Sequence, residues 1–82
     1  MIIELLQVQG CRNVDAAREL LEGCLRELVL ELPVVERVGN FASPTILIDG
    51  LDVMGRHDVL GAACRLDLPT RDRVLAALRE AT

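Results

Sequence analysis

The chain of 82 residues is poor in aromatic side chains: it has no tryptophan or tyrosine, and Phe41 is its single phenylalanine. One ring cannot form the stacking surface on which single-stranded nucleic acids bind. Lysine and arginine form no basic run and the formal net charge is −4, so we expect neither nucleic acid nor an anionic membrane as a partner. Hydrophobic residues make up 51% of the chain, which predicts a folded domain with an aliphatic core.

The sequence also shows no sign of a targeting segment in its first residues. The first residues have no basic lead-in, and Glu4 and Gln7 interrupt the apolar stretch, so we expect no signal peptide and no membrane helix. We therefore expect a cytoplasmic protein in which residues 1–82 form a single domain. Three cysteines in that compartment indicate reactive or buried thiols rather than a disulfide framework.

The first half of the chain predicts a strand, a helix and a second strand. Residues 2–8 form a short apolar run, typical of a strand buried on both faces. A helix is expected from about 14 to about 29, with Asn13 as its cap and apolar residues at helical spacing. Residues 33–38 fit either a helix begun by Pro33 or an edge strand, and their three valines favour the strand.

The second half predicts a hairpin. Residues 45–48 form a strand, Asp49-Gly50 is a strong turn signal, and residues 51–54 return as the partner strand. Residues 55–69 are expected to be a long loop with at most one helical turn.

A last helix is expected over 71–81, with Thr70 as its cap. Its core-facing residues are expected to be Val74, Leu75, Leu78 and Ala81.

These elements predict an α/β fold with a mixed four-stranded sheet, because one right-handed crossover gives a parallel pair and the hairpin an antiparallel pair. We assume the strand order 2-1-3-4, with strand one central. In that order the end of strand one, the start of strand three and the end of strand four share one edge of the sheet. Cys11, the Ser43-Pro44 pair and Cys64 are therefore expected to converge there.

Cys11 has the sequence context of a reactive thiol. It stands directly before the first predicted helix, whose free N–H groups and dipole favour a thiolate, and Arg12 adds a positive charge beside it. We expect a lowered pKa; the alternative is a small apolar residue in a tight turn.

The other two cysteines differ from each other. Cys24 lies on the apolar face of the helix and is expected to be a core thiol. Cys64 either resolves a disulfide with Cys11 or packs beneath the loop, and both readings stay open because the sequence cannot test the Cα spacing that a disulfide needs.

The remaining polar candidates are weaker. His57, the only histidine, is expected to be solvated, although it could assist proton transfer. The spacing of Asp49, Asp52 and Asp58 fits no calcium loop, and we expect them to be turn residues.

Two segments, Gly10-Cys11-Arg12-Asn13 and Ser43-Pro44-Thr45 with the strand and turn that follow, resemble a compact thioredoxin- or glutaredoxin-like protein over most of the chain. The resemblance implies a thioredoxin-like βαβ-ββα fold with a reduced or absent middle helix. It also implies thiol–disulfide chemistry, in which Cys11 is the active-site cysteine and needs no cofactor.

The resemblance further implies that the Ser43-Pro44 bond is cis, so that Ser43 faces the thiol and pairs with an extended substrate. Ser43, Pro44 and Thr45 are then the substrate-binding residues, supported by Arg12 and Asn13.

One position departs from this family. A dithiol member has a second cysteine three residues after the first, and here that residue is Val14. What remains is monothiol exchange, a remote pair with Cys64, or a role without redox chemistry.

The tail from Ala63 to Thr70 is similar to small bacterial alkylmercury lyase-like proteins. This second resemblance implies that Cys11 and Cys64 bind a soft metal such as Hg(II) or Cu(I). An organomercurial lyase also needs a proton donor, for which Asp67 and His57 are the candidates.

Three functions therefore stand as hypotheses. The first is a thiol oxidoreductase that acts on a thiol or disulfide protein or on a small thiol, with Cys11 attacking and Cys64 resolving. The second is a protein that handles mercury or another soft metal with the same sulfurs. The third is a non-catalytic thioredoxin-like binding module.

Overall fold

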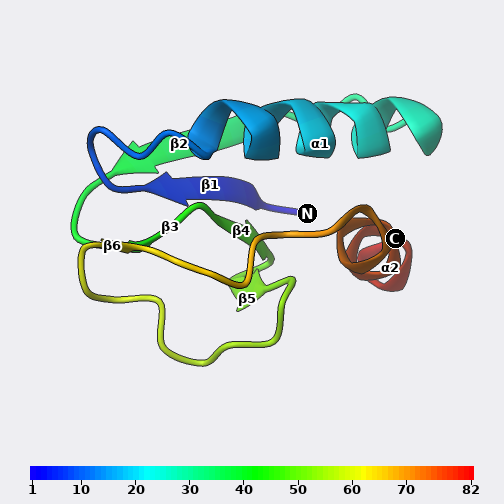
Figure 1. Ribbon diagram of the computed structural model, residues 1–82. Coiled ribbons are helices and arrows are strands. Elements are labelled where there is room, and N and C mark those ends of the chain that lie inside the picture. Colours follow the sequence, from blue (N-terminus) through cyan, green and yellow to red (C-terminus); the bar gives the residue numbers. More distant parts are fainter.

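Six strands and two helices make up the computed structural model, which describes residues 1–82 (Figure 1). The elements are β1 (Ile3–Gln7), α1 (Val14–Glu27), β2 (Val34–Val38), β3 (Ala42–Ser43), β4 (Thr45–Ile48), β5 (Leu51–Asp52), β6 (Ala63–Cys64) and α2 (Arg71–Ala81).

The central sheet has four strands in the order β2-β1-β4-β5. β2 is parallel to β1, while β4 is antiparallel to both β1 and β5. The predicted α/β class and mixed four-stranded sheet are confirmed, and residues 34–38 form the strand that their valines favoured. The strand order is not the predicted 2-1-3-4, because an additional short strand, β3, precedes β4 and pairs with β6 in a separate two-stranded sheet.

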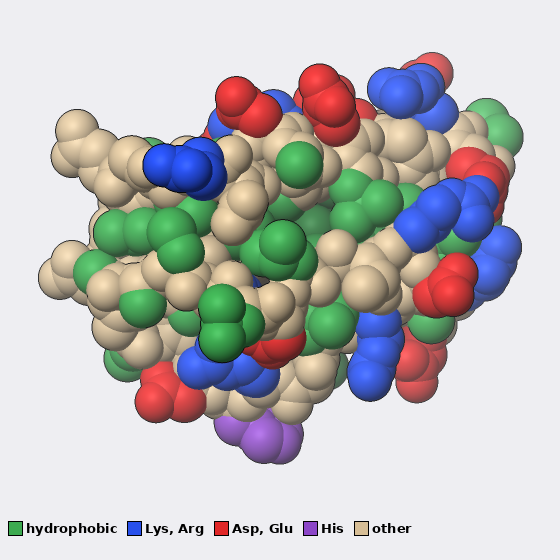
Figure 2. All heavy atoms as spheres, in the orientation of Figure 1, with side chains coloured by type: hydrophobic (Ala, Val, Ile, Leu, Met, Phe, Trp, Pro, Cys, Tyr) green, Lys and Arg blue, Asp and Glu red, His purple; other side chains and the backbone are tan.

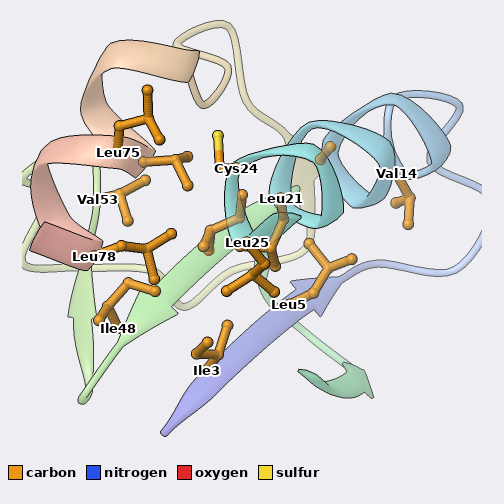
Figure 3. Packing of buried hydrophobic residues seen from close by; sticks show 13 residues of the cluster. Ile3, Leu5, Val14, Leu21, Cys24, Leu25, Ile48, Val53, Leu75 and Leu78 are labelled. Carbon is orange, nitrogen blue, oxygen red and sulfur yellow. The ribbon is translucent and has the colours of Figure 1, made fainter. Parts of the chain in front are cut away.

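Both helices pack against the same face of the central sheet, and the core between them is aliphatic (Figure 3). Neighbouring residues Leu5 and Leu6 of β1 are both buried, so the prediction of a strand covered on both faces is confirmed. Leu6 pairs with Thr45 and lies outside the helix-side cluster. The long segment between β5 and α2 passes over that second face (Figure 1).

The structure differs from the predicted local details in four places. Asn13 precedes α1, but its backbone is already helical (φ −91°, ψ −2°) and its side chain caps nothing, because a side-chain cap requires an extended backbone at that residue. β5 ends at Asp52 rather than at residue 54. The segment 55–69 contains β6 and no helical turn. Ala81 is exposed and lines an open groove between α2 and the β4–β5 hairpin.

The last helix otherwise follows the prediction. Thr70 has an extended backbone, and its hydroxyl accepts a hydrogen bond from the Arg73 N–H at 3.3 Å. Val74, Leu75 and Leu78 are buried in the core. Neither helix combines the length and the apolar character that crossing a membrane requires.

Helix α1 is followed by a valine with an unfavourable, left-handed backbone conformation. Val29 adopts a φ of 55°, and the next N–H, that of Leu30, donates back to the carbonyl of Leu25 at 2.9 Å. This is the bonding of a left-handed helix terminus, a position that glycine usually fills. A β-branched side chain is disfavoured there because its Cβ crowds the backbone.

We predict that Val29→Gly raises the free energy of unfolding by about 1 kcal/mol, because glycine adopts this backbone without the steric cost. The Val29 side chain is 84% exposed, so little packing is lost. Urea unfolding gives the measurement. The control is Val35→Gly, a half-exposed valine of β2, which should lower stability. A loss of stability in both variants would contradict this account of the helix end.

Candidate functional site

Two cysteines from opposite halves of the chain meet at one end of the sheet. The Cys64 thiol donates to the sulfur of Cys11 with the two Sγ atoms 3.0 Å apart, and both residues are free thiols. Ser43 lies between the strands that deliver them, and its carbonyl oxygen is 3.8 Å from Cys11 Sγ. The structure thus brings together Cys11, Ser43 and Cys64 at the edge where the predicted sheet placed them.

Cys11 is positioned by the turn that joins β1 to α1. Gly10 adopts a φ of 82°, and the Cys11 N–H donates to the Val8 carbonyl at 3.2 Å. The turn leaves Cys11 half-buried at the start of the helix, with its side chain against the core. Asn13 contributes its backbone N–H to the sulfur instead of its side chain.

Ser43 is the buried residue of the site. The peptide bond between Ser43 and Pro44 is cis. The Ser43 side chain is fully buried, and its hydroxyl has no hydrogen-bond partner.

Cys64 is held opposite Ser43 by the two-stranded sheet. β6 runs parallel to β3 with Cys64 in register with Ser43, and the N–H of the next residue, Arg65, donates to the Ser43 carbonyl at 2.8 Å. Cys64 is exposed, so its sulfur is open to solvent as well as to Cys11.

Arg65 fastens this strand to the sheet with its side chain. Its guanidinium donates to Asp52 at 2.9 Å, to Asp67 at 2.7 Å and to the Thr45 hydroxyl at 2.8 Å. The side chains of Arg65 and Asp52 are 1% and 0% exposed, so this ion pair is shielded from water. Because Arg65 adjoins Cys64 in the chain, the buried pair sets the position of the exposed thiol.

Arg65 and Asp52 are the two site-building residues that the sequence did not reveal, and Asp52 was expected only to form a turn. Asp52 does accept the N–H groups of Met54 and Arg56, both at 3.2 Å, but its burial and its pairing with Arg65 are new. Asp52 and Thr45 lie 13 and 20 residues from Arg65, so no local pattern marks the cluster.

The two thiols differ in their readiness to ionise. Partial burial opposes ionisation of Cys11, but the hydrogen bond from the Cys64 thiol, the adjacent Ser43 side chain and the Asn13 backbone N–H outweigh it and place the pKa of Cys11 below the ordinary 9.0. Donating to Cys11 raises the pKa of Cys64, with desolvation and the neighbouring sulfur adding to the effect. Cys11 is therefore the first of the pair to become a thiolate.

The third cysteine takes no part in this site. Cys24 is 2% exposed in the helix-side core, so the prediction of a core thiol is confirmed (Figure 3). Burial raises the pKa of Cys24, the opposite direction from Cys11.

The predicted substrate-binding residues face inward. Ser43, Pro44 and Thr45 are all buried. The Thr45 hydroxyl donates to the Ala42 carbonyl at 2.6 Å and accepts from Arg65, so it is not free for a ligand. The predicted supporting residue Arg12 is exposed and forms no ion pair.

The candidate proton donors are not arranged for that task. His57 is exposed and forms no hydrogen bond (Figure 2). Hydrogen bonds from Arg65 lower the pKa of Asp67 to about 2, so Asp67 is ionised at neutral pH. Asp58 accepts the backbone N–H of Leu60, two residues on, as turn residues do. Asp49 lies in the β4–β5 turn, but it accepts the N–H of Ile2, which precedes the neighbouring strand β1.

Cys11 and Cys64 bring two sulfurs together, and no group of three histidine, cysteine, aspartate or glutamate side chains is gathered in a way that could hold a metal ion. Compared with models of protein families, with curated protein sequences and with solved structures, the chain matches none. The function is therefore inferred from the geometry of the site itself.

We predict that Arg65→Met lowers the free energy of unfolding by about 3 kcal/mol or more, because it leaves Asp52 charged, buried and unpaired. The control is Arg56→Met, which removes an exposed arginine 3.8 Å from Asp67 and should cost less than about 1 kcal/mol. Urea unfolding of both variants checks the difference. Equal losses would show that the Arg65 pair does not hold the segment.

We also predict that Cys64→Ala raises the pKa of Cys11, because it removes the thiol that donates to the Cys11 thiolate. Cys64→Ser keeps a donor and should shift that pKa less. Thiolate absorbance against pH, in a Cys24→Ala background, isolates Cys11. A Cys11 pKa that is the same in both variants would exclude this hydrogen bond as the cause.

Proposed function

We propose that this protein carries out thiol–disulfide exchange, with Cys11 as the attacking thiolate and Cys64 as the resolving thiol. The single observation that supports the proposal most is the 3.0 Å separation of the two sulfurs. A disulfide bond is about 2.05 Å long, so a small adjustment of the two side chains would close the pair. The lowered pKa of Cys11 makes more of it a nucleophilic thiolate, at a given pH, than an ordinary cysteine would be.

The exchange proceeds in two balanced steps. The Cys11 thiolate attacks one sulfur of a substrate disulfide, a bond forms between them, and the other substrate sulfur leaves as a thiolate. Cys64 then loses its proton to solvent and attacks the Cys11 sulfur, which releases the second substrate thiolate. The substrate has gained two electrons, and the protein has lost them as the Cys11–Cys64 disulfide.

Ionisation of Cys11 controls the order of these steps. While Cys11 is a thiolate, the Cys64 proton is held between the sulfurs and the pKa of Cys64 is raised. Once Cys11 is bonded to substrate, that negative charge is gone and Cys64 can ionise more easily. The resolving thiol thus becomes reactive after the first step has taken place.

We propose that the domain is thioredoxin-like, with the second cysteine supplied by a loop instead of by the first helix. The features in favour are the cysteine at the start of α1, the cis-proline entering the strand beside β1, and the mixed sheet. Val14, at the usual place of the second cysteine, is buried in the core. A reducing compartment such as the cytoplasm would keep the pair as thiols between turnovers.

Soft-metal binding is the second candidate, because two adjacent sulfurs suit Hg(II) or Cu(I). The pair alone would supply the ligands. Cleavage of an organomercurial has less support, since Asp67 is held as a carboxylate and the exposed His57 contacts neither sulfur.

We predict that mild oxidation of the wild-type protein yields an intramolecular Cys11–Cys64 disulfide, visible as the loss of two hydrogens in the intact mass and in the linked peptides. Cys64→Ser should abolish it and give only disulfide-linked dimers through Cys11. Cys24→Ala should form the bond as the wild type does, because Cys24 is remote in the core.

The outcomes separate the candidate functions. Dimers alone in the wild type would leave a monothiol protein or a binding module. A tight Hg(II) complex that weakens in Cys64→Ser, without reversible disulfide formation, would favour the metal function over redox exchange.

A further inference from the structure

A segment of the loop lies along the edge of β3 that leads to the dithiol. We call residues 59–65 the covering segment; it follows residues 40–43 from Asn40 to Ser43 (Figure 1). The bonds between them are Ala42 N to Val59 O at 2.8 Å, Gly61 N to Asn40 O at 3.1 Å, Ala63 N to Phe41 O at 3.4 Å and Arg65 N to Ser43 O at 2.8 Å.

These bonds use the backbone groups that a second extended chain would need. Addition of a strand to a sheet edge depends on unpaired N–H and C=O groups. Along β3 the carbonyls of Phe41 and Ser43 and the N–H of Ala42 are all engaged by the covering segment. Because the Ser43 carbonyl is also the one beside the Cys11 sulfur, the paired edge is the one at the reactive thiol.

Side-chain bonds, in addition to the backbone bonds, hold the covering segment in place. Its last residue, Arg65, is bonded to buried Asp52 and Thr45, and releasing it would leave Asp52 without its ion partner. An incoming polypeptide would therefore have to break four backbone bonds and a buried ion pair before it could pair with β3. A small molecule meets no such barrier, because Cys11 is half-exposed and Cys64 is exposed.

We infer that the covering segment excludes extended polypeptides from β3 and restricts the dithiol to small disulfides and thiols. The inference rests on the proposed function and narrows its substrate class. A segment of the protein's own chain, hydrogen-bonded to residues 40–43, occupies the place at which a substrate strand would pair. The exchange step is unchanged: the Cys11 thiolate attacks one sulfur of the small disulfide, and the other sulfur leaves as a thiolate.

The test uses two disulfides with the same leaving group. One joins mercaptoethanol to N-acetylcysteine amide; the other joins it to the same cysteine at the centre of an uncharged peptide of a strand's length. Both react with the reduced protein, and mass spectrometry follows the loss of free Cys11. We expect the small disulfide to react at least about tenfold faster, because the peptide reacts only with the fraction of molecules whose covering segment is open.

A proline substitution in the covering segment should remove the preference for the small disulfide over the peptide disulfide. Ala63→Pro deletes the N–H that donates to Phe41 and should raise the peptide rate several-fold relative to the small-disulfide rate measured on the same variant, which corrects for any change in Cys11 itself. The control is Ala62→Pro, since Ala62 donates no backbone hydrogen bond and is equally exposed. A selectivity that Ala63→Pro leaves intact would overturn the role of the covering segment.

Failure of the inference can be told from failure of the proposed function. Equal rates for the two disulfides in the wild type, after allowance for their rates with a free thiol, would leave the redox function standing and overturn the inference. If neither disulfide oxidises the Cys11–Cys64 pair, the redox function falls. Alkylation of wild-type Cys11 by iodoacetamide, free or attached to the same peptide, repeats the comparison without redox chemistry or a variant, and equal rates there would again overturn the inference.

Discussion

The buried ion pair between Arg65 and Asp52 is the interaction on which the rest of the site depends. Removing both charges from water is costly, and such a pair is tolerated only where geometry and extra hydrogen bonds compensate. Here Asp52 also accepts two backbone N–H groups, and the guanidinium also reaches Asp67 and the Thr45 hydroxyl. The pair ties a long loop to the sheet face that no helix covers. Together with the backbone pairing of β6 with β3, it places Cys64 beside Cys11.

The two thiols of the site, Cys11 and Cys64, are chemically identical groups that differ in pKa. Cys11 lies at a helix start and receives hydrogen bonds, whereas Cys64 lies on an exposed strand and donates one. The difference in pKa therefore comes from their positions in the fold and not from neighbouring residue types alone.

The architecture also explains why the reactive end is the one covered by a loop. Two helices fill one face of the sheet with an aliphatic core, and this leaves the other face to the segment between β5 and α2 (Figures 1 and 3). Apolar side chains of that segment, among them Leu60 at 72% and Leu66 at 100% exposed, lie at the surface. The segment therefore serves three purposes: it shields the sheet, supplies Cys64 and occupies the edge of β3.

Much of the fold was determined by the sequence itself, because the signals are local. Apolar periodicity predicted the helix after Cys11, and the turn residues predicted the hairpin. Cys24 lies on the apolar face of that helix, which packs into the core. Only the tertiary structure decided the rest. The Arg65 cluster, the pairing of β3 with β6 and the contact of two sulfurs 53 residues apart join groups that share no local pattern. Even the capping role expected of Asn13 failed, because the turn around Cys11 gave its backbone a helical conformation. Such contacts form between side chains that meet in space, and their energy depends on burial and on distances that no short stretch of sequence specifies.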